Sequence, residues 1–218
     1  MRISEAMRIP KLHYPKYELP LQDWIALALN KNTLEEVVKV ISSGAPPENL
    51  PVASRHNSRF ITKFLEEEVT RQFSYYYRPL VEVITNAIDS RYEDTSDANI
   101  IDVKIKFGGH FECSDNGKSM NLEQLLTMLI IPMATDKDPA KDIGRFGVGF
   151  LSTLNYCLRK PEDSVVEMAA HSDEGSYKIR FSSSSSDVKD LILSITPITN
   201  FRNKKGTKVS IKSCVYDK

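Results

Sequence analysis

The chain has 218 residues, of which 41% are hydrophobic and 27% charged, so a globular protein is expected and neither disorder nor a fibrous repeat is indicated. Lysine plus arginine and aspartate plus glutamate both number 29, so the formal net charge is zero and no overall field attracts nucleic acid or anionic lipid. Three scattered cysteines match neither a disulfide framework nor a zinc site, and the first 17 residues lack the apolar stretch of a signal peptide. We therefore expect a cytoplasmic protein without a membrane segment.

Residues 1–55 are interpreted as a helical N-terminal extension ahead of a main domain, residues 56–218. Two short helical patterns, Trp24–Leu29 and Leu34–Ile41, are followed by the chain-breaking residues Pro46, Pro47 and Pro51. We expect this extension to be a strap that completes the core; the alternative is an arm for dimer swapping or for docking a partner.

The main domain is predicted to begin with helices and a β-hairpin. Apolar spacing predicts helices over Phe60–Gln72 and about Tyr77–Tyr92. Alternating residues from Ile101 to Phe107, a Gly-Gly turn and His110–Cys113 are typical of a hairpin.

The second half of the domain is predicted to be mainly strands. Asn121 is expected to cap a helix that runs to about Ile131, and the polar stretch Thr135–Asp142 is expected to be a mobile loop. Strand-like segments then follow at Val165–Ala170, Tyr177–Phe181, Leu191–Ile198 and Lys208–Lys212. The order predicts an α+β fold, a two-layer sandwich with helices on one face of a mixed, mostly antiparallel sheet.

The helix predicted around residue 82 carries a polar stripe. At about 100° per residue, Glu82, Asn86 and Asp89 fall within a sector of about 60°. Alone, such a stripe is an ordinary solvated face. A carboxylate can also activate water, however, and an amide oxygen suits Mg²⁺.

Two glycine-containing segments follow the hairpin. Asp115-Asn116-Gly117-Lys118-Ser119-Met120 places a carboxylate at the end of a strand; it is not a P-loop, because position 112 is a glutamate. In Gly144–Phe150, three glycines precede an apolar helix, where backbone N–H groups favour an anion and glycine permits close approach of a phosphate chain. A late Gly206-Thr207 lies at a turn into a strand.

Taken in order, Glu-x-x-x-Asn-Ala-x-Asp, Asp-x-Gly, Gly-x-x-Gly-x-Gly and the late Gly-Thr resemble the motifs of the GHKL ATPases, which include gyrase, the ninety-kilodalton heat-shock chaperones, histidine kinases and MutL. The runs IGRFGVGFLS from Ile143 and GTKVSI from Gly206 are most similar to the chaperone branch. The resemblance covers about Phe60–Lys212 and implies the Bergerat fold, with ATP or ADP and Mg²⁺ as ligands.

The resemblance implies a role for each matching residue. Glu82 would polarise the attacking water as general base, Asn86 would hold Mg²⁺, and Asp89 would order the pocket. Asp115 would accept from the adenine amino group, with Thr207 supporting it. Gly117 would let the backbone approach the base, and Met120 would pack on the ring. The implied phosphate-binding segment is Gly144, Arg145, Phe146, Gly147, Val148, Gly149 and Phe150, and Ile131–Asp142 would form a lid.

Two departures qualify the expected activity. Ser119 stands where the family usually has a second glycine, so the adenine loop is expected to be stiffer. Gyrase, MutL and the chaperones take a catalytic Lys or Arg from a following domain, so hydrolysis by this chain is expected to be slow or absent.

The leading expectation is a nucleotide-gated, chaperone-like ATPase in which ATP orders the lid and drives association with a second copy. Three alternatives stay open: a DNA-processing clamp of the MutL type, a histidine kinase, and a non-catalytic nucleotide-sensing or dimerisation module. Histidine kinases usually lack an aspartate at the position of Asp89, and they usually lack the motif Gly-Arg-Phe-Gly-Val-Gly-Phe. No client protein, nucleic acid or membrane partner is indicated.

Overall fold

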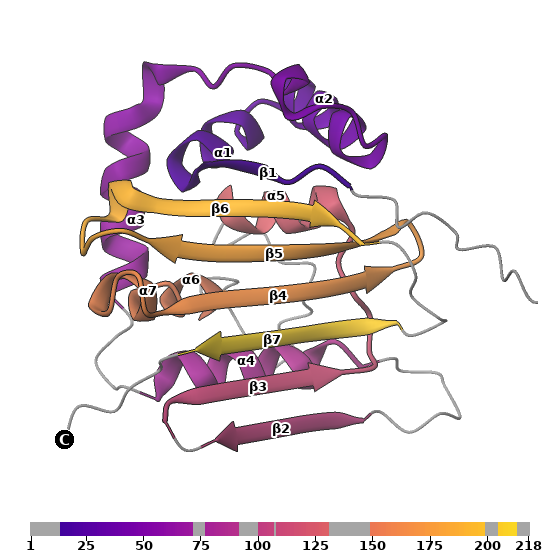
Figure 1. The fold of residues 1–218 in the computed structure, drawn as a ribbon, viewed down its shortest axis with the longest axis vertical. Coiled ribbons are helices and arrows are strands. Elements are labelled where there is room, and N and C mark those ends of the chain that lie inside the picture. The colour runs from indigo at the N-terminus through magenta and orange to yellow at the C-terminus, as the bar shows by residue number, and fades with distance from the viewer. Residues whose placement is uncertain are drawn as a thin grey trace, which may run out of the picture.

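A seven-stranded sheet runs through the computed structural model, which describes residues 14–71, 77–91, 100–106, 108–130, 149–198 and 205–212 (Figure 1). The strand order is β1–β6–β5–β4–β7–β3–β2, and every pairing between described strands is antiparallel. The strands are β1 (Tyr17–Pro20), β2 (Ile101–Lys106), β3 (His110–Asp115), β4 (Val165–Ser172), β5 (Gly175–Ser183), β6 (Leu191–Pro197) and β7 (Gly206–Lys212).

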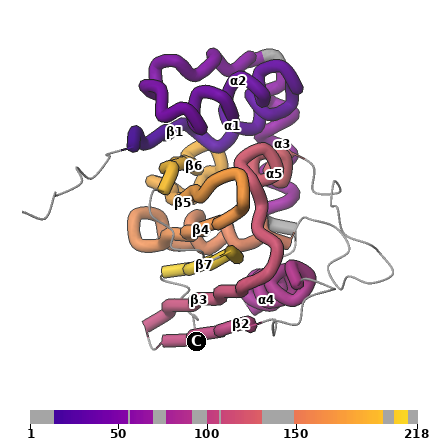
Figure 2. The backbone as a smooth tube through the Cα atoms, turned by 90° about the vertical axis from the view of Figure 1, so that its right-hand side faces the viewer, coloured from indigo at the N-terminus to yellow at the C-terminus, as the bar shows by residue number. Residues whose placement is uncertain are grey.

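The helices cover one face of this sheet, and α1 and α2 continue past its β1 end (Figure 2). They are α1 (Leu21–Ala28), α2 (Lys31–Ser42), α3 (Ser58–Arg71), α4 (Arg78–Asp89), α5 (Leu122–Ile130), α6 (Gly149–Ser152) and α7 (Asn155–Arg159). The predicted α+β class, with helices on one face of the sheet, is confirmed.

Alternation along the strands separates a buried face from an open one. Phe111 on β3, Val166 on β4 and Phe181 on β5 are at most 1% exposed, and they face the helices. Their chain neighbours point to the other face because successive side chains in a strand alternate.

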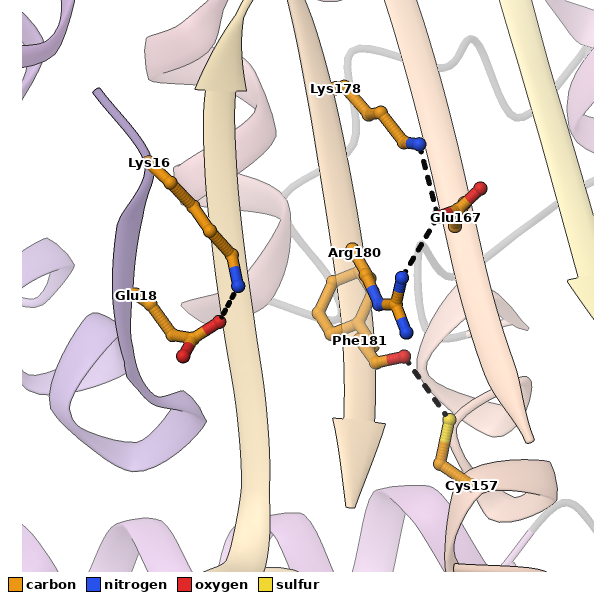
Figure 3. Close-up of polar contacts among 7 residues, drawn as sticks. All are labelled: Lys16, Glu18, Cys157, Glu167, Lys178, Arg180 and Phe181. Atoms are coloured by element: carbon orange, nitrogen blue, oxygen red, sulfur yellow. Dashed lines mark hydrogen bonds and ion pairs between the residues drawn. The ribbon is translucent and has the colours of Figure 1, made fainter. Parts of the chain in front are cut away.

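The open face is covered by ion pairs between neighbouring strands. Glu167 on β4 contacts Lys178 at 3.1 Å and Arg180 at 3.7 Å, both on β5 (Figure 3). Glu112 on β3 similarly lies 2.9 Å from the Lys208 ammonium on β7. Cross-strand pairs of opposite charge contribute modestly to sheet stability, and their charged groups stay in contact with water.

The N-terminal segment packs into the same core as the rest of the chain. Strand β1 pairs with β6, an element the sequence did not predict, and Tyr17 in it is fully buried. On α1, Trp24 is also fully buried, and its Nε1 donates to the carbonyl of Leu193 on β6 at 2.9 Å. The described part of the predicted extension therefore completes the core at one end of the sheet.

Two local predictions are confirmed. The hairpin forms with Gly108 and Gly109 between β2 and β3, both at positive φ. Asn121 caps α5, since its Oδ1 accepts from the backbone N–H of Gln124 at 2.8 Å while the Gln124 side chain accepts from Asn121 N at 3.0 Å.

Two cysteines are buried in the core. Burial raises the pKa of the Cys113 thiol to about 11, with the Asp115 and Asp102 charges adding to the rise. Burial likewise raises the pKa of Cys157 to about 12, and its Sγ donates to the Phe181 carbonyl at 3.6 Å (Figure 3). Both thiols are structural.

Among the helices that the structure describes, none has the length and apolar character needed to cross a bilayer.

Replacement of Trp24 by alanine tests whether the N-terminal helices belong to one cooperative unit. We expect Trp24→Ala to lower the free energy of unfolding by about 3–5 kcal/mol, because a large buried side chain and its hydrogen bond are lost. Urea unfolding followed by circular dichroism measures the change, with the half-buried Gln22→Ala on the same helix as control. Two separate transitions, with only one of them shifted, would show that α1 and the sheet unfold independently.

Candidate functional site

The polar flank of α4 lies against the first residue of α6. A Cβ atom added at Gly149 would overlap a carboxylate oxygen of Glu82 and lie 2.8 Å from the Glu82 Cβ. Arg78 donates from Nε to Glu82 Oε1 at 3.2 Å, and the Glu82 side chain is only 19% exposed. The first and third predicted motifs therefore meet here, and position 149 has to be glycine.

Asp115, the last residue of β3, is a partly buried carboxylate that accepts from two backbone N–H groups. Its Oδ1 lies 2.9 Å from Gly117 N and 3.3 Å from Thr207 N. Burial raises the pKa of Asp115, and these two donors, together with the Ser90 hydroxyl, oppose the rise. The second and fourth predicted motifs therefore meet at this carboxylate.

Two further glycines allow backbone segments to touch around Asp115. Gly206 has φ +124°, and a Cβ there would overlap the Asp115 carbonyl oxygen. A Cβ at Gly117 would overlap both the carbonyl and the hydroxyl oxygens of Ser90, and Lys118 N donates to the same carbonyl. The C-terminal end of α4, the turn after β3 and the start of β7 are thus held together.

Ser119 ties this turn to two other strands. Its Oγ accepts from the backbone N–H of His171 on β4 at 3.0 Å and lies 3.2 Å from Thr207 Oγ1 on β7. The Ser119 hydroxyl therefore fixes the turn.

Helix α4 connects these two clusters. Glu82 lies at the cluster with Gly149, and Ser90, the residue that follows the helix, lies at the cluster with Asp115. The step of eight positions from Glu82 to Ser90 corresponds to a rise of about 12 Å along the helix axis. Asn86 and Asp89 are half-buried on the stretch between the two clusters.

The remaining predicted site residues fall into the core or outside the described ranges. Met120 is half-buried and packs against the core. The Phe150 side chain is 3% exposed with its ring centroid 5.8 Å from that of Phe181, so the side chain belongs to the core. The predicted phosphate-loop residues 144–148 and the predicted lid, residues 131–142, lie outside the described residues.

The predicted Mg²⁺ ligand does not require a dedicated protein cage. Among the described residues, no three His, Cys, Asp or Glu side chains are grouped to hold a metal ion. Mg²⁺ at a nucleotide is usually held by one or two protein ligands together with phosphates and water. The assignment of Mg²⁺ to the Asn86 amide therefore stays a prediction.

A solvent-open hollow of about 380 Å³ lies beside the Asp115 turn. Its walls are Lys118, Ser119, Asn121, Gln124, His171, Ser172, Asp173, Glu174 and Lys205. Neither Glu82 nor Asp115 lines it, so it adjoins the clustered motifs through Ser119 and does not coincide with them.

Sequence reasoning missed Ser90 and the contacts of Ser119. Ser90 was detectable, because it stands four residues after Asn86 and eight after Glu82 and so continues the same helical stripe. No local sequence pattern could predict the hydrogen bond from His171 N to Ser119 Oγ, because it joins residues 52 positions apart.

Comparison of the chain with models of known protein families gives no match, and comparison with curated proteins gives none either.

The raised pKa of Asp115 predicts that Asp115→Asn increases thermal stability at neutral pH. Burial disfavours the ionised carboxylate in the folded state, so the stability contributed by Asp115 is present at acid pH and lost as pH rises through its folded pKa. Asparagine carries no such cost and keeps an oxygen for Gly117 N and Thr207 N. Melting temperatures should show a gain at neutral pH that shrinks toward about pH 4.

The exposed Asp173→Asn is the matched control, because its carboxylate pairs only at the surface with Lys205. A lower melting temperature for Asp115→Asn at neutral pH would contradict the direction of the shift.

Proposed function

We propose that the chain binds ATP with Mg²⁺ between α4 and the end of β3, and that it is a chaperone-like ATP-binding domain of the GHKL type. One observation carries the proposal: a single helix places Glu82 against Gly149 at one end and Ser90 against the Asp115 turn at the other. Separated sequence motifs are thereby aligned along one side of α4, over a length that an extended nucleoside triphosphate can follow.

Asp115 supports recognition of adenine in this proposal. A carboxylate oxygen accepts from an exocyclic amino group, and Gly117 leaves no side chain between the turn and Ser90. Guanine carries a carbonyl oxygen in place of that amino group, so two acceptors would face each other. We therefore infer a preference for adenine nucleotides.

Glu82 and Asn86 support the phosphate end of the proposal. The Arg78 guanidinium holds Glu82 Oε1, which orients the carboxylate beside Gly149. In this arrangement Glu82 takes a proton from the attacking water, and Asn86, one turn along, offers its amide oxygen to Mg²⁺. Association with a second copy on nucleotide binding belongs to the proposal as well.

The deciding experiment is calorimetric titration of the protein with ADP and Mg²⁺. Asp115→Asn should weaken binding about 10- to 100-fold, because a charge-assisted acceptor is replaced by an amide that can also present a donor. Glu167→Gln changes a carboxylate on the open face of the sheet and should leave binding unchanged. Equal ADP affinities of Asp115→Asn and wild type would show that this carboxylate does not recognise adenine. GDP serves as the control for base specificity.

The proposed division of labour along α4 is tested by turnover. Because hydrolysis by this chain is expected to be slow, the wild-type rate is measured first, as single turnover with protein in excess over ATP. Glu82→Ala should keep ATP affinity within about twofold while lowering that rate by up to about 10²- to 10⁴-fold, the usual range for a general base. Asn86→Ala should instead lose the Mg²⁺-dependent part of the affinity. Normal hydrolysis by Glu82→Ala would show that another group activates the water.

A further inference from the structure

Strand β2 forms one edge of the sheet. All six of its residues pair with β3 on one side, and no other described strand pairs with it on the other (Figure 1). The opposite end of the sheet differs, because α1 and α2 continue beyond β1 there (Figure 2). An open edge presents unpaired N–H and C=O groups that another strand can satisfy.

The side of β2 that faces the helices carries exposed apolar side chains. Val103 pairs with Cys113 and Ile105 with Phe111, and directly opposed residues share a face of the sheet. The partners on β3 are buried, whereas Val103 is 39% and Ile105 67% exposed. Apolar surface therefore continues from the core to the sheet edge.

Helix α4 extends this apolar surface. Val81, 47% exposed, is followed by Ile84 and Ile88 at helical spacing, on the flank away from the Glu82 carboxylate and α6. The other end of α4 is fixed at the turn after β3, so Val81 lies toward the Ile105 end of β2. We call Val81, Ile84, Ile88, Val103 and Ile105 the edge patch.

We propose that β2 pairs antiparallel with β2 of a second copy of this chain, about a two-fold axis at Val103. In this register Asp102 lies opposite Lys104 of the second copy, and the same pair recurs across the axis. Ile101 lies opposite Ile105, and Val103 opposite its own counterpart. The strand IDVKIK is thus complementary to itself in both charge and apolar face.

The charges select this register. Centring the axis on Lys104 instead would place Asp102 opposite Lys106, but it would also put two lysines directly opposite each other, which is unfavourable. Charged residues on edge strands often serve to prevent pairing. On β2, however, Asp102 and Lys104 have opposite signs and pair with each other on the open face, where Lys104 also lies 3.6 Å from Glu112. Across the two-fold axis each of them lies opposite the residue of opposite charge in the second copy, so the pairing extends this set of charges and opposes none of them.

The same two-fold axis brings the edge patches together. With neighbouring strands about 4.8 Å apart, the two β3 strands lie about 14 Å from each other. The two-fold axis keeps both α4 helices on the same face of the joined sheet. Helices with side chains are about 10–12 Å across. The apolar flanks of the two α4 helices therefore meet over the joined β2 strands, while the Glu82 flanks face away. This dimer needs no nucleotide and goes beyond the proposed function.

Charge exchange at positions 102 and 104 tests the interface by analytical ultracentrifugation of the full chain without nucleotide. Wild type should dimerise in the micromolar range. Asp102→Lys alone and Lys104→Asp alone should each weaken the dimer at least about tenfold, because each places like charges opposite one another twice. An equimolar mixture of the two variants should restore a dimer, and so should the double exchange D102K/K104D within one chain.

Circular dichroism of each variant shows that it is folded, and restoration by mixing cannot arise from a folding defect. A wild-type protein that stays monomeric at high concentration would overturn the proposal, as would single variants that dimerise like wild type. A dimer that forms only with an ATP analogue would also overturn it, while supporting the nucleotide-dependent association proposed above.

Discussion

A carboxylate that leaves water has to find hydrogen-bond donors inside the protein, because a buried charge without partners is strongly unfavourable. Asp115 finds them in its own turn and in β7, which is 92 residues further along the chain. For Thr207 N to reach this carboxylate, Gly206 has to lie against the Asp115 backbone. The turn also holds Ser90 at the end of α4. The position of α4 over β3, and with it the alignment of the candidate site, depends on how this one group is satisfied.

Local signals predicted the parts of the fold that are decided locally. The hairpin between β2 and β3 was recognisable because its alternation and its glycine turn lie within 15 residues. Strand β1 was not, because the four residues Tyr17–Pro20 include a glutamate and a proline and become a strand only beside β6. Its partner lies about 175 residues later, and no short-range pattern carries that information.

The candidate site shows the same division. The stripe of Glu82 and Asn86 follows from helical geometry, so the sequence alone identified it. Contact between Glu82 and Gly149 does not follow, because it depends on how α4 and α6 pack on the sheet. The motif order suggested that these residues act together, and the packing supplies a physical reason for it. The glycine loop before Gly149 remains a prediction from sequence.

The two proposals use opposite flanks of α4. One flank is polar and is turned toward α6, where the nucleotide proposal places its chemistry. The other is apolar and is turned toward the β2 edge, where the self-association proposal places its contact. Because the flanks face different directions, the proposals expect substitutions at Val81 or Ile88 to change self-association and substitutions at Glu82 to change nucleotide turnover.

The sulfur of Cys113 lies on the same face of β3 as Asp115 and two residues before it. A thiol reacts with electrophiles and oxidants as its thiolate, and a pKa of about 11 leaves almost none of that form at neutral pH. The thiol behind the proposed adenine site is therefore unreactive at neutral pH. An alkylating inhibitor that enters from the base side would therefore react slowly with Cys113, and a covalent ligand for this site would need a nucleophile other than this thiol.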